Sequence, residues 1–120
     1  MCISADVLCR DVIRRIVAQW RGVRLLHTAE AASGLKLAAE RSPGLIFLDA
    51  SVADSEKVLV RLRGSADTSR TPVVVLGSHP QIGDRARFVW QGASAYETKP
   101  IDVSRLRRVI FDLLVASQWG

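Results

Sequence analysis

Apolar residues along the chain fall into short continuous runs separated by longer stretches in which they recur every three or four positions. Two runs are uninterrupted, residues 45–48 (LIFL) and residues 73–76 (VVVL), and each follows a proline closely. Both are too short for a globular helix, so we predict two strands that are buried on both faces. Such strands are typical of a parallel sheet covered by helices.

The helically spaced stretches lie between these runs. They predict helices at residues 6–20, 31–41, 58–64, 84–91 and 102–114, with Asp6 and Asp102 as N-cap residues. Three further strands are predicted at residues 1–3, 23–28 and 95–96. The first of these starts at residue 1, so we expect a shortened first strand.

Strand and helix therefore alternate five times, which predicts an α/β fold: a doubly wound (βα)5 parallel sheet with helices on both faces. Right-handed crossovers favour the strand order 2-1-3-4-5 of flavodoxin-like proteins. The length of 120 residues suits a single domain over residues 1–120.

Two charged residues follow predicted strands directly. Asp49 comes at the end of the buried run 45–48, and Lys99 comes just after the fifth strand. In open parallel sheets the carboxyl ends of the strands form the ligand crevice. We therefore expect the Asp49 carboxylate and the Lys99 ammonium to approach one another at that edge.

Composition narrows the function classes. The 17 Lys and Arg against 12 Asp and Glu give a net charge of +5, but the arginines are spread along the chain without interleaved aromatics. We therefore expect a solvated basic surface and no nucleic-acid binding. The chain has no apolar run long enough for a membrane span and no signal-peptide pattern at its start, so we expect a cytoplasmic protein with no membrane contact.

Several segments together resemble the receiver domain of two-component response regulators. They are PGLIFLD around Asp49, RLR after the third helix, TPVVVL, GASAYETKP around Lys99, and the helix start IDVSRL. The resemblance covers nearly the whole chain, and the spacing of the Asp and Lys-Pro motifs makes it specific.

The resemblance implies a role in phosphorelay signalling without enzyme activity of its own. Asp49 would be the phosphoacceptor for a histidine kinase or phosphotransfer protein, and Lys99 would pair with the phosphoryl oxygens. Tyr96 would be the aromatic switch residue. The resemblance also implies that a homodimer could form through the fourth helix, fifth strand and fifth helix.

The metal ligands depart from the family pattern. Receivers hold Mg²⁺ with two acids at the end of the first strand, and the apolar phase of the first helix matches Ser4 and Ala5 to these positions. Asp6 falls one position later and is interpreted first as an N-cap. Asp49 and Asp6 remain as metal ligands, so we expect Mg²⁺ binding to be impaired.

Other pocket positions depart as well. The hydroxyl residue that the family places at the end of the fourth strand is matched by Gly77, and the adjacent Ser78 could replace it only if the turn is rebuilt. After Asp49 the chain has Val52-Ala53 in place of the family's Met-Pro-like step. The loop that shapes the pocket is therefore expected to differ.

Two alternative functions stay open. Asp49 could be a structural acid paired with Lys99, and Tyr96 a core aromatic, in a pseudo-receiver that acts only as a protein interaction or dimerisation module. A flavin or nucleotide binder on the same architecture is disfavoured, because no phosphate-cradling glycine-rich loop follows the first strand.

Overall fold

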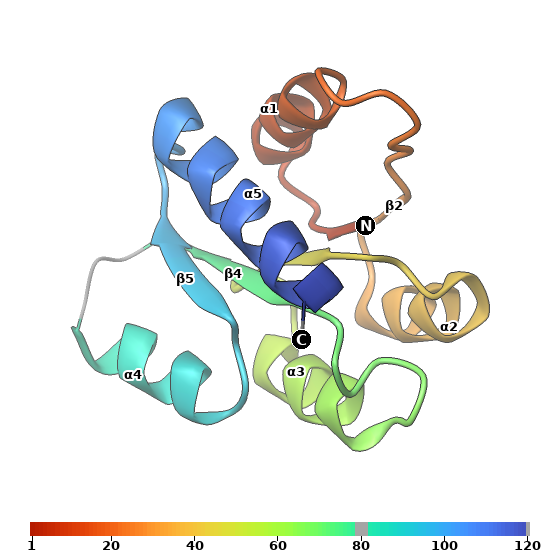
Figure 1. The fold of residues 1–120 in the computed structure, drawn as a ribbon. Helices are drawn as coiled ribbons and strands as arrows, with labels where there is room; N and C mark the ends of the chain where they lie inside the picture. The colour runs from red at the N-terminus through yellow and green to blue at the C-terminus, as the bar shows by residue number, and fades with distance from the viewer. Residues whose placement is uncertain (79–81, 120) are drawn as a thin grey trace.

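The protein is described here by a computed structural model that covers residues 1–78 and 82–119. Its five strands are β1 (Cys2–Ile3), β2 (His27–Thr28), β3 (Ile46–Asp49), β4 (Val73–Gly77) and β5 (Ala95–Thr98). Its five helices are α1 (Val7–Val17), α2 (Ala31–Arg41), α3 (Ser55–Gly64), α4 (Ile82–Trp90) and α5 (Val103–Trp119). Strand and helix alternate from end to end (Figure 1).

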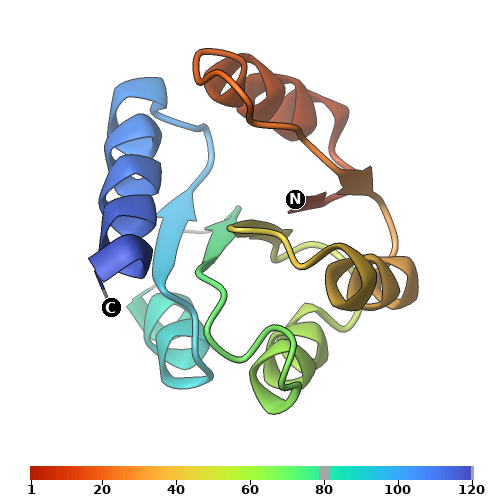
Figure 2. The ribbon, with the colours of Figure 1, turned by 45° about the vertical axis from the view of Figure 1, so that its right-hand side comes forward.

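All strand pairs are parallel, and the sheet has the order β2-β1-β3-β4-β5. The predicted doubly wound topology is therefore confirmed. Helices α1 and α5 cover one face of the sheet, and α2, α3 and α4 cover the other (Figure 2).

The central strands supply both cores. Phe47 packs with residues of α1 and α5, whereas its neighbours Ile46 and Leu48 pack toward the opposite helices. All three side chains are almost fully buried, because successive residues of a strand point to opposite faces and both faces carry helices. This two-sided burial explains why the run 45–48 is apolar throughout.

The first strand is short, as the sequence predicted, and this shortens its neighbour. β1 offers only Cys2 and Ile3 as partners, which pair with His27 and Thr28 of β2. The prediction of a strand over residues 23–28 is correct only at its end. Of residues 23–26, Leu26 bonds to the sheet, where its carbonyl accepts from the N–H of Cys2 (2.8 Å).

The predicted bounds of four helices need correction. Helix α4 begins at Ile82 and not at residue 84, and helix α5 continues to Trp119 and not only to residue 114. Helix α1 ends at Val17 and not at residue 20, since the amides of Gln19 and Trp20 bond to carbonyls three residues back and tighten the chain into a turn. Helix α3 begins at Ser55, three residues before the first apolar position that marked it. Polar first-turn residues carry no apolar periodicity and so gave no signal.

Among the described residues, no helix combines the length and the apolar character that crossing a membrane requires.

Candidate functional site

Asp49 ends β3 and lies at the carboxyl edge of the sheet, where it is completely buried. Its Oδ2 accepts hydrogen bonds from the Ser4 hydroxyl (2.6 Å) and the Lys99 ammonium (2.8 Å). Its Oδ1 accepts two more, from the backbone N–H (3.0 Å) and the hydroxyl (2.8 Å) of Ser51. A buried carboxylate is costly unless it is paired, and this one has four donors.

Ser4 and Ser51 were not predicted as partners of Asp49. Ser51 stands two residues after Asp49, a spacing at which an aspartate side chain bonds to the following backbone in an Asx turn, so the sequence Asp-Ala-Ser held this signal. Ser4 was recognised only as a residue that cannot supply charge. Its hydroxyl can donate, however, and it does so to Asp49.

Lys99 reaches this site from the opposite side of the crevice. It follows β5, and its backbone N–H donates to the carbonyl of Gly77 (2.8 Å), which fixes the chain at the end of β4. Its Nζ lies 2.8 Å from Asp49 Oδ2 and 2.9 Å from Asp6 Oδ2. The predicted approach of Asp49 and Lys99 is thus present in the structure, with Asp6 as a third member.

The two carboxylate oxygens of Asp6 have different hydrogen-bond partners. Oδ1 accepts from the N–H groups of Leu8 and Cys9 and caps α1, which confirms the predicted N-cap. Oδ2 accepts from Lys99. Because the Asp6 side chain is fixed by capping α1, its second oxygen is held in position to accept from Lys99.

The surroundings keep all three groups charged. Burial would raise the pKa of Asp49, but the hydrogen bonds from Lys99, Ser4 and Ser51 outweigh it and hold this pKa below its usual value. The hydrogen bond from Lys99 likewise lowers the pKa of Asp6. Burial opposes the charge on Lys99, yet its two carboxylate partners raise its pKa. The cluster is two carboxylates around one ammonium.

The apolar phase of α1 agrees with the phase predicted from the sequence. Its buried residues include Cys9, Ile13 and Val17, which places Ser4 beside Asp49 and leaves Asp6 at the start of the helix. Within residues 1–78 and 82–119, no group of three or more His, Cys, Asp or Glu side chains is arranged to hold a metal ion.

Tyr96 and Gly77 form a close pair beside the site. The Tyr96 side chain is buried, with 3% of its surface exposed, and its ring stacks on Phe88 with the ring centroids 5.7 Å apart. A Cβ atom built on Gly77 would lie 1.8 Å from the Tyr96 hydroxyl oxygen. The inward ring therefore occupies the space that a hydroxyl side chain at position 77 would need.

A hollow of about 270 Å³ lies beside Tyr96. It is lined by Ser51, Ser78 and Tyr96 together with residues of α3 and α4. Ser78 is exposed, and in the described part of the chain no hydrogen bond connects it to Asp49. Ser78 thus lines the hollow without reaching the carboxylate.

Bacterial regulatory proteins are similar to this chain in sequence. The transcriptional regulatory protein KdpE of Mycobacterium tuberculosis is 30% identical over 100 residues, which cover 80% of this chain and 44% of KdpE. The polar-differentiation response regulator DivK of Brucella abortus is 29% identical over 105 residues, covering 86% of this chain and 81% of DivK. The chain thus spans under half of KdpE but most of DivK. No family model matches it.

Solved structures give the same fold. The receiver domain of NtrX from Brucella abortus superposes with a TM-score of 0.83 at 25% identity, covering 94% of this chain and 95% of that domain. The receiver domain of a sensor histidine kinase from Pseudomonas aeruginosa superposes with a TM-score of 0.83 at 19% identity, over 94% and 93% of the two chains. That structure holds a magnesium ion in its active site cleft.

The contact between Tyr96 and Gly77 makes a testable prediction. Gly77→Ser should destabilise the protein by about 1–3 kcal/mol, because the new side chain overpacks a filled space. The same change in a Tyr96→Ala background should cost less than half as much, since the obstructing ring is gone. Urea unfolding of the four proteins measures both costs. Equal costs in the two backgrounds would show that the ring does not occupy this space.

A second prediction concerns acid. Because the folded-state pKa of Asp49 is depressed, its contribution to stability is fully present above the unfolded value of about 3.9 and is lost as pH falls through the lower folded value. Asp49→Asn should therefore be less stable than the parent at pH 7, and its stability should fall less between about pH 5 and pH 2. Denaturant midpoints across this range test it. An equal loss of stability in the two proteins as pH falls would be inconsistent with a depressed pKa of Asp49.

Proposed function

This chain is a receiver domain of the response regulator family of two-component signal transduction, and we propose that it works as a pseudo-receiver. In this role it binds protein partners in a conformation that its own lysine maintains, without a phosphorylation step. The proposal concerns the state of the Asp49 cluster.

The observation that carries the proposal is the saturation of Asp49. A carboxylate has about four lone-pair sites, and Asp49 accepts from the Ser4 hydroxyl, the Lys99 ammonium, and the N–H and hydroxyl of Ser51. To attack a phosphoryl group, an oxygen must first release one of these donors and become exposed. Both changes oppose nucleophilic reaction at a side chain that is 0% exposed.

The residues present do not fit a magnesium ion well. Mg²⁺ needs near-octahedral oxygen ligands with free lone pairs. Asp6 uses Oδ1 to cap α1, Asp49 is saturated, and the Ser4 hydroxyl donates its hydrogen bond to Asp49. The Lys99 ammonium already lies between the two carboxylates and supplies the positive charge there. The proposed function therefore involves no metal ion.

The Tyr96 contact supports a fixed state. With Gly77 in β4 there is room for the inward ring, and the stacked Phe88 holds it there. In this proposal Tyr96 acts as a constant part of the surface made by α4, β5 and α5, and not as a reporter of phosphorylation. In this proposal Ser78 lines the hollow and does not bind a phosphoryl group.

The partners would be proteins of a two-component system. A histidine kinase or phosphotransfer protein, or a second copy bound through α4, β5 and α5, is the partner implied by the family resemblance. Each helix of that face exposes a large aromatic side chain, Trp90 on α4 at 91% exposure and Phe111 on α5 at 58%. Exposed aromatics of this size are typical anchors of protein interfaces.

A second candidate function is a working phosphoacceptor, favoured by the pairing of Asp49 with Lys99 at the crevice edge. An Asp49 oxygen would attack the phosphorus of a phosphohistidine, an O–P bond would form as the P–N bond breaks, and the imidazole nitrogen would leave with the electron pair. Lys99 would offset the added negative charge. This route requires Ser4 or Ser51 to release Asp49 first.

Incubation with acetyl phosphate and Mg²⁺, followed by intact-mass measurement, distinguishes the two candidates. The pseudo-receiver predicts no phosphate-sized mass gain in the parent protein or in Asp49→Asn at any magnesium concentration. The receiver domain that holds magnesium serves as the positive control. A mass gain in the parent that disappears in Asp49→Asn would establish the phosphoacceptor and reject the pseudo-receiver.

A further inference from the structure

The positive charge of the protein is gathered in two segments of the chain. Residues 6–24 and 99–112 contain α1, the segment after it and the first part of α5, and they hold nine of the 17 basic residues but only four of the 12 acidic ones. The remaining eight basic and eight acidic residues balance, so these two segments carry the whole excess of +5. The N-terminal ammonium of Met1 is buried against the Leu45 carbonyl and does not belong to this surface.

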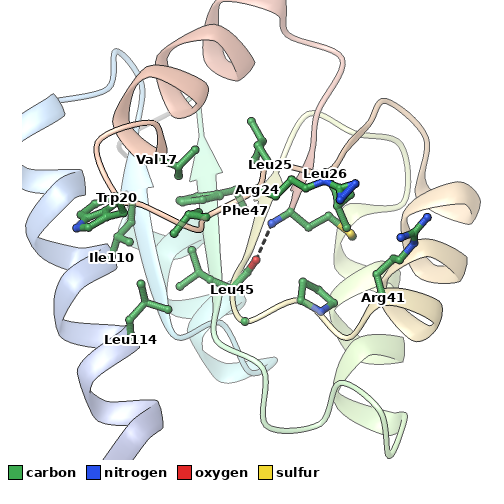
Figure 3. A pocket seen from close by; sticks show the side chains of 14 residues that line it. Val17, Trp20, Arg24, Leu25, Leu26, Arg41, Leu45, Phe47, Ile110 and Leu114 are labelled. Carbon is green, nitrogen blue, oxygen red and sulfur yellow. Dashed lines mark hydrogen bonds between the residues drawn. The ribbon is translucent and has the colours of Figure 1, made fainter.

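The fold brings the two segments together from opposite ends of the sequence. Helices α1 and α5 pack on the same face of the sheet (Figure 2). Figure 3 shows Trp20, which follows α1, beside Ile110 and Leu114 of α5, and all three pack in one core cluster. Along the sequence the arginines are spread, which was the reason to expect no nucleic-acid binding. In the folded protein, many of them share one layer.

Five arginines of this layer are exposed. Arg14 and Arg15 lie on α1, whose apolar side faces the sheet, and Arg21 lies in the segment after it. Arg107 and Arg108 lie on α5, directly after a buried leucine. Because the buried side of each helix is apolar, these guanidinium groups are on the side that faces solvent.

The acidic residues of the layer leave part of this charge unbalanced. Asp11 is shared by the two exposed arginines of α1. In the part of the chain that the structure describes, Arg21, Arg107 and Arg108 form no ion pair. Asp112 lies one helical turn after Arg108 and forms no ion pair there either. The surface therefore complements a ligand with several negative charges.

An exposed aromatic side chain lies among these arginines. Phe111 is 58% exposed and follows Arg107 by four residues and Arg108 by three. Residues at these spacings are neighbours on the surface of a helix. An aromatic ring beside guanidinium groups suits single-stranded nucleic acid, because a base can stack on the ring while the phosphates accept hydrogen bonds from the arginines. In a double helix the base faces are already stacked on one another.

We propose that the surface of α1 and α5 binds single-stranded nucleic acid without sequence preference. The phosphates accept from Arg107 and Arg108, a base stacks on Phe111, and the arginines of α1 attract the strand on either side of this contact. Contacts to phosphates carry no sequence information, which is why no preference is expected. The stacking ring distinguishes this ligand from an acidic protein, which would satisfy the arginines alone. The Asp49 cluster takes no part, so this proposal and the pseudo-receiver fail independently.

Fluorescence anisotropy with a labelled oligothymidylate of about 20 nucleotides, longer than the usual site of about 4–16, tests the proposal. The logarithm of the binding constant should fall linearly with the logarithm of the salt concentration. Arg107→Gln and Arg108→Gln should each weaken binding and reduce this slope by about 0.7, the value for one phosphate of a single strand. Phe111→Ala should weaken binding by about fivefold and leave the slope unchanged. Asp112→Asn should strengthen binding, because it removes a repelling charge.

The opposite layer of the protein supplies matched controls. Arg61→Gln and Arg70→Gln change arginines that are exposed and form no ion pair within the described residues, and Trp90→Ala removes an aromatic side chain that is 91% exposed on α4. All three should bind the oligonucleotide as the parent does. The proposal would be overturned by absence of binding, by losses in these controls equal to those in the α5 variants, or by equally tight binding of duplex DNA or polyglutamate.

Discussion

The ammonium of Lys99, held between the carboxylates of Asp6 and Asp49, is the interaction on which the arrangement of this site depends. It connects three strand ends: Asp6 follows β1, Asp49 ends β3 and Lys99 follows β5. A lysine in this position neutralises the buried Asp49 from within the chain. The crevice that a parallel sheet forms at its carboxyl edge is thus occupied by the protein's own cation.

This internal pairing accounts for the other features of the pocket. The Ser4 hydroxyl lies beside Asp49 and donates to it, which adds to the saturation of the carboxylate, whereas a carboxylate at this position would add repulsion. Gly77 and Tyr96 are matched in the same way, since the missing side chain of one provides the space for the hydroxyl of the other. These contacts support the proposed pseudo-receiver, in which the pocket keeps one conformation and does not switch between an unphosphorylated and a phosphorylated one.

The sequence predicted the parts of the structure that arise from periodicity. The apolar runs 45–48 and 73–76 identified the central strands, and the alternation of elements predicted the sheet order. The positions of Asp49 and Lys99 followed from that topology. The contacts of Ser4 could not be predicted, and the sequence left open whether Tyr96 is a core aromatic or a switch residue. Both depend on which rotamers fit a space closed by distant residues.

A double-mutant cycle on Asp49 and Lys99 tests the central claim most directly. The free energies of unfolding of the parent, Asp49→Asn, Lys99→Met and the double variant give the coupling between the two side chains, free of the effects each substitution has alone. The account predicts a favourable coupling of at least about 1 kcal/mol, since each single variant leaves a charge without its partner. Additivity of the two substitutions within about 0.3 kcal/mol would contradict it.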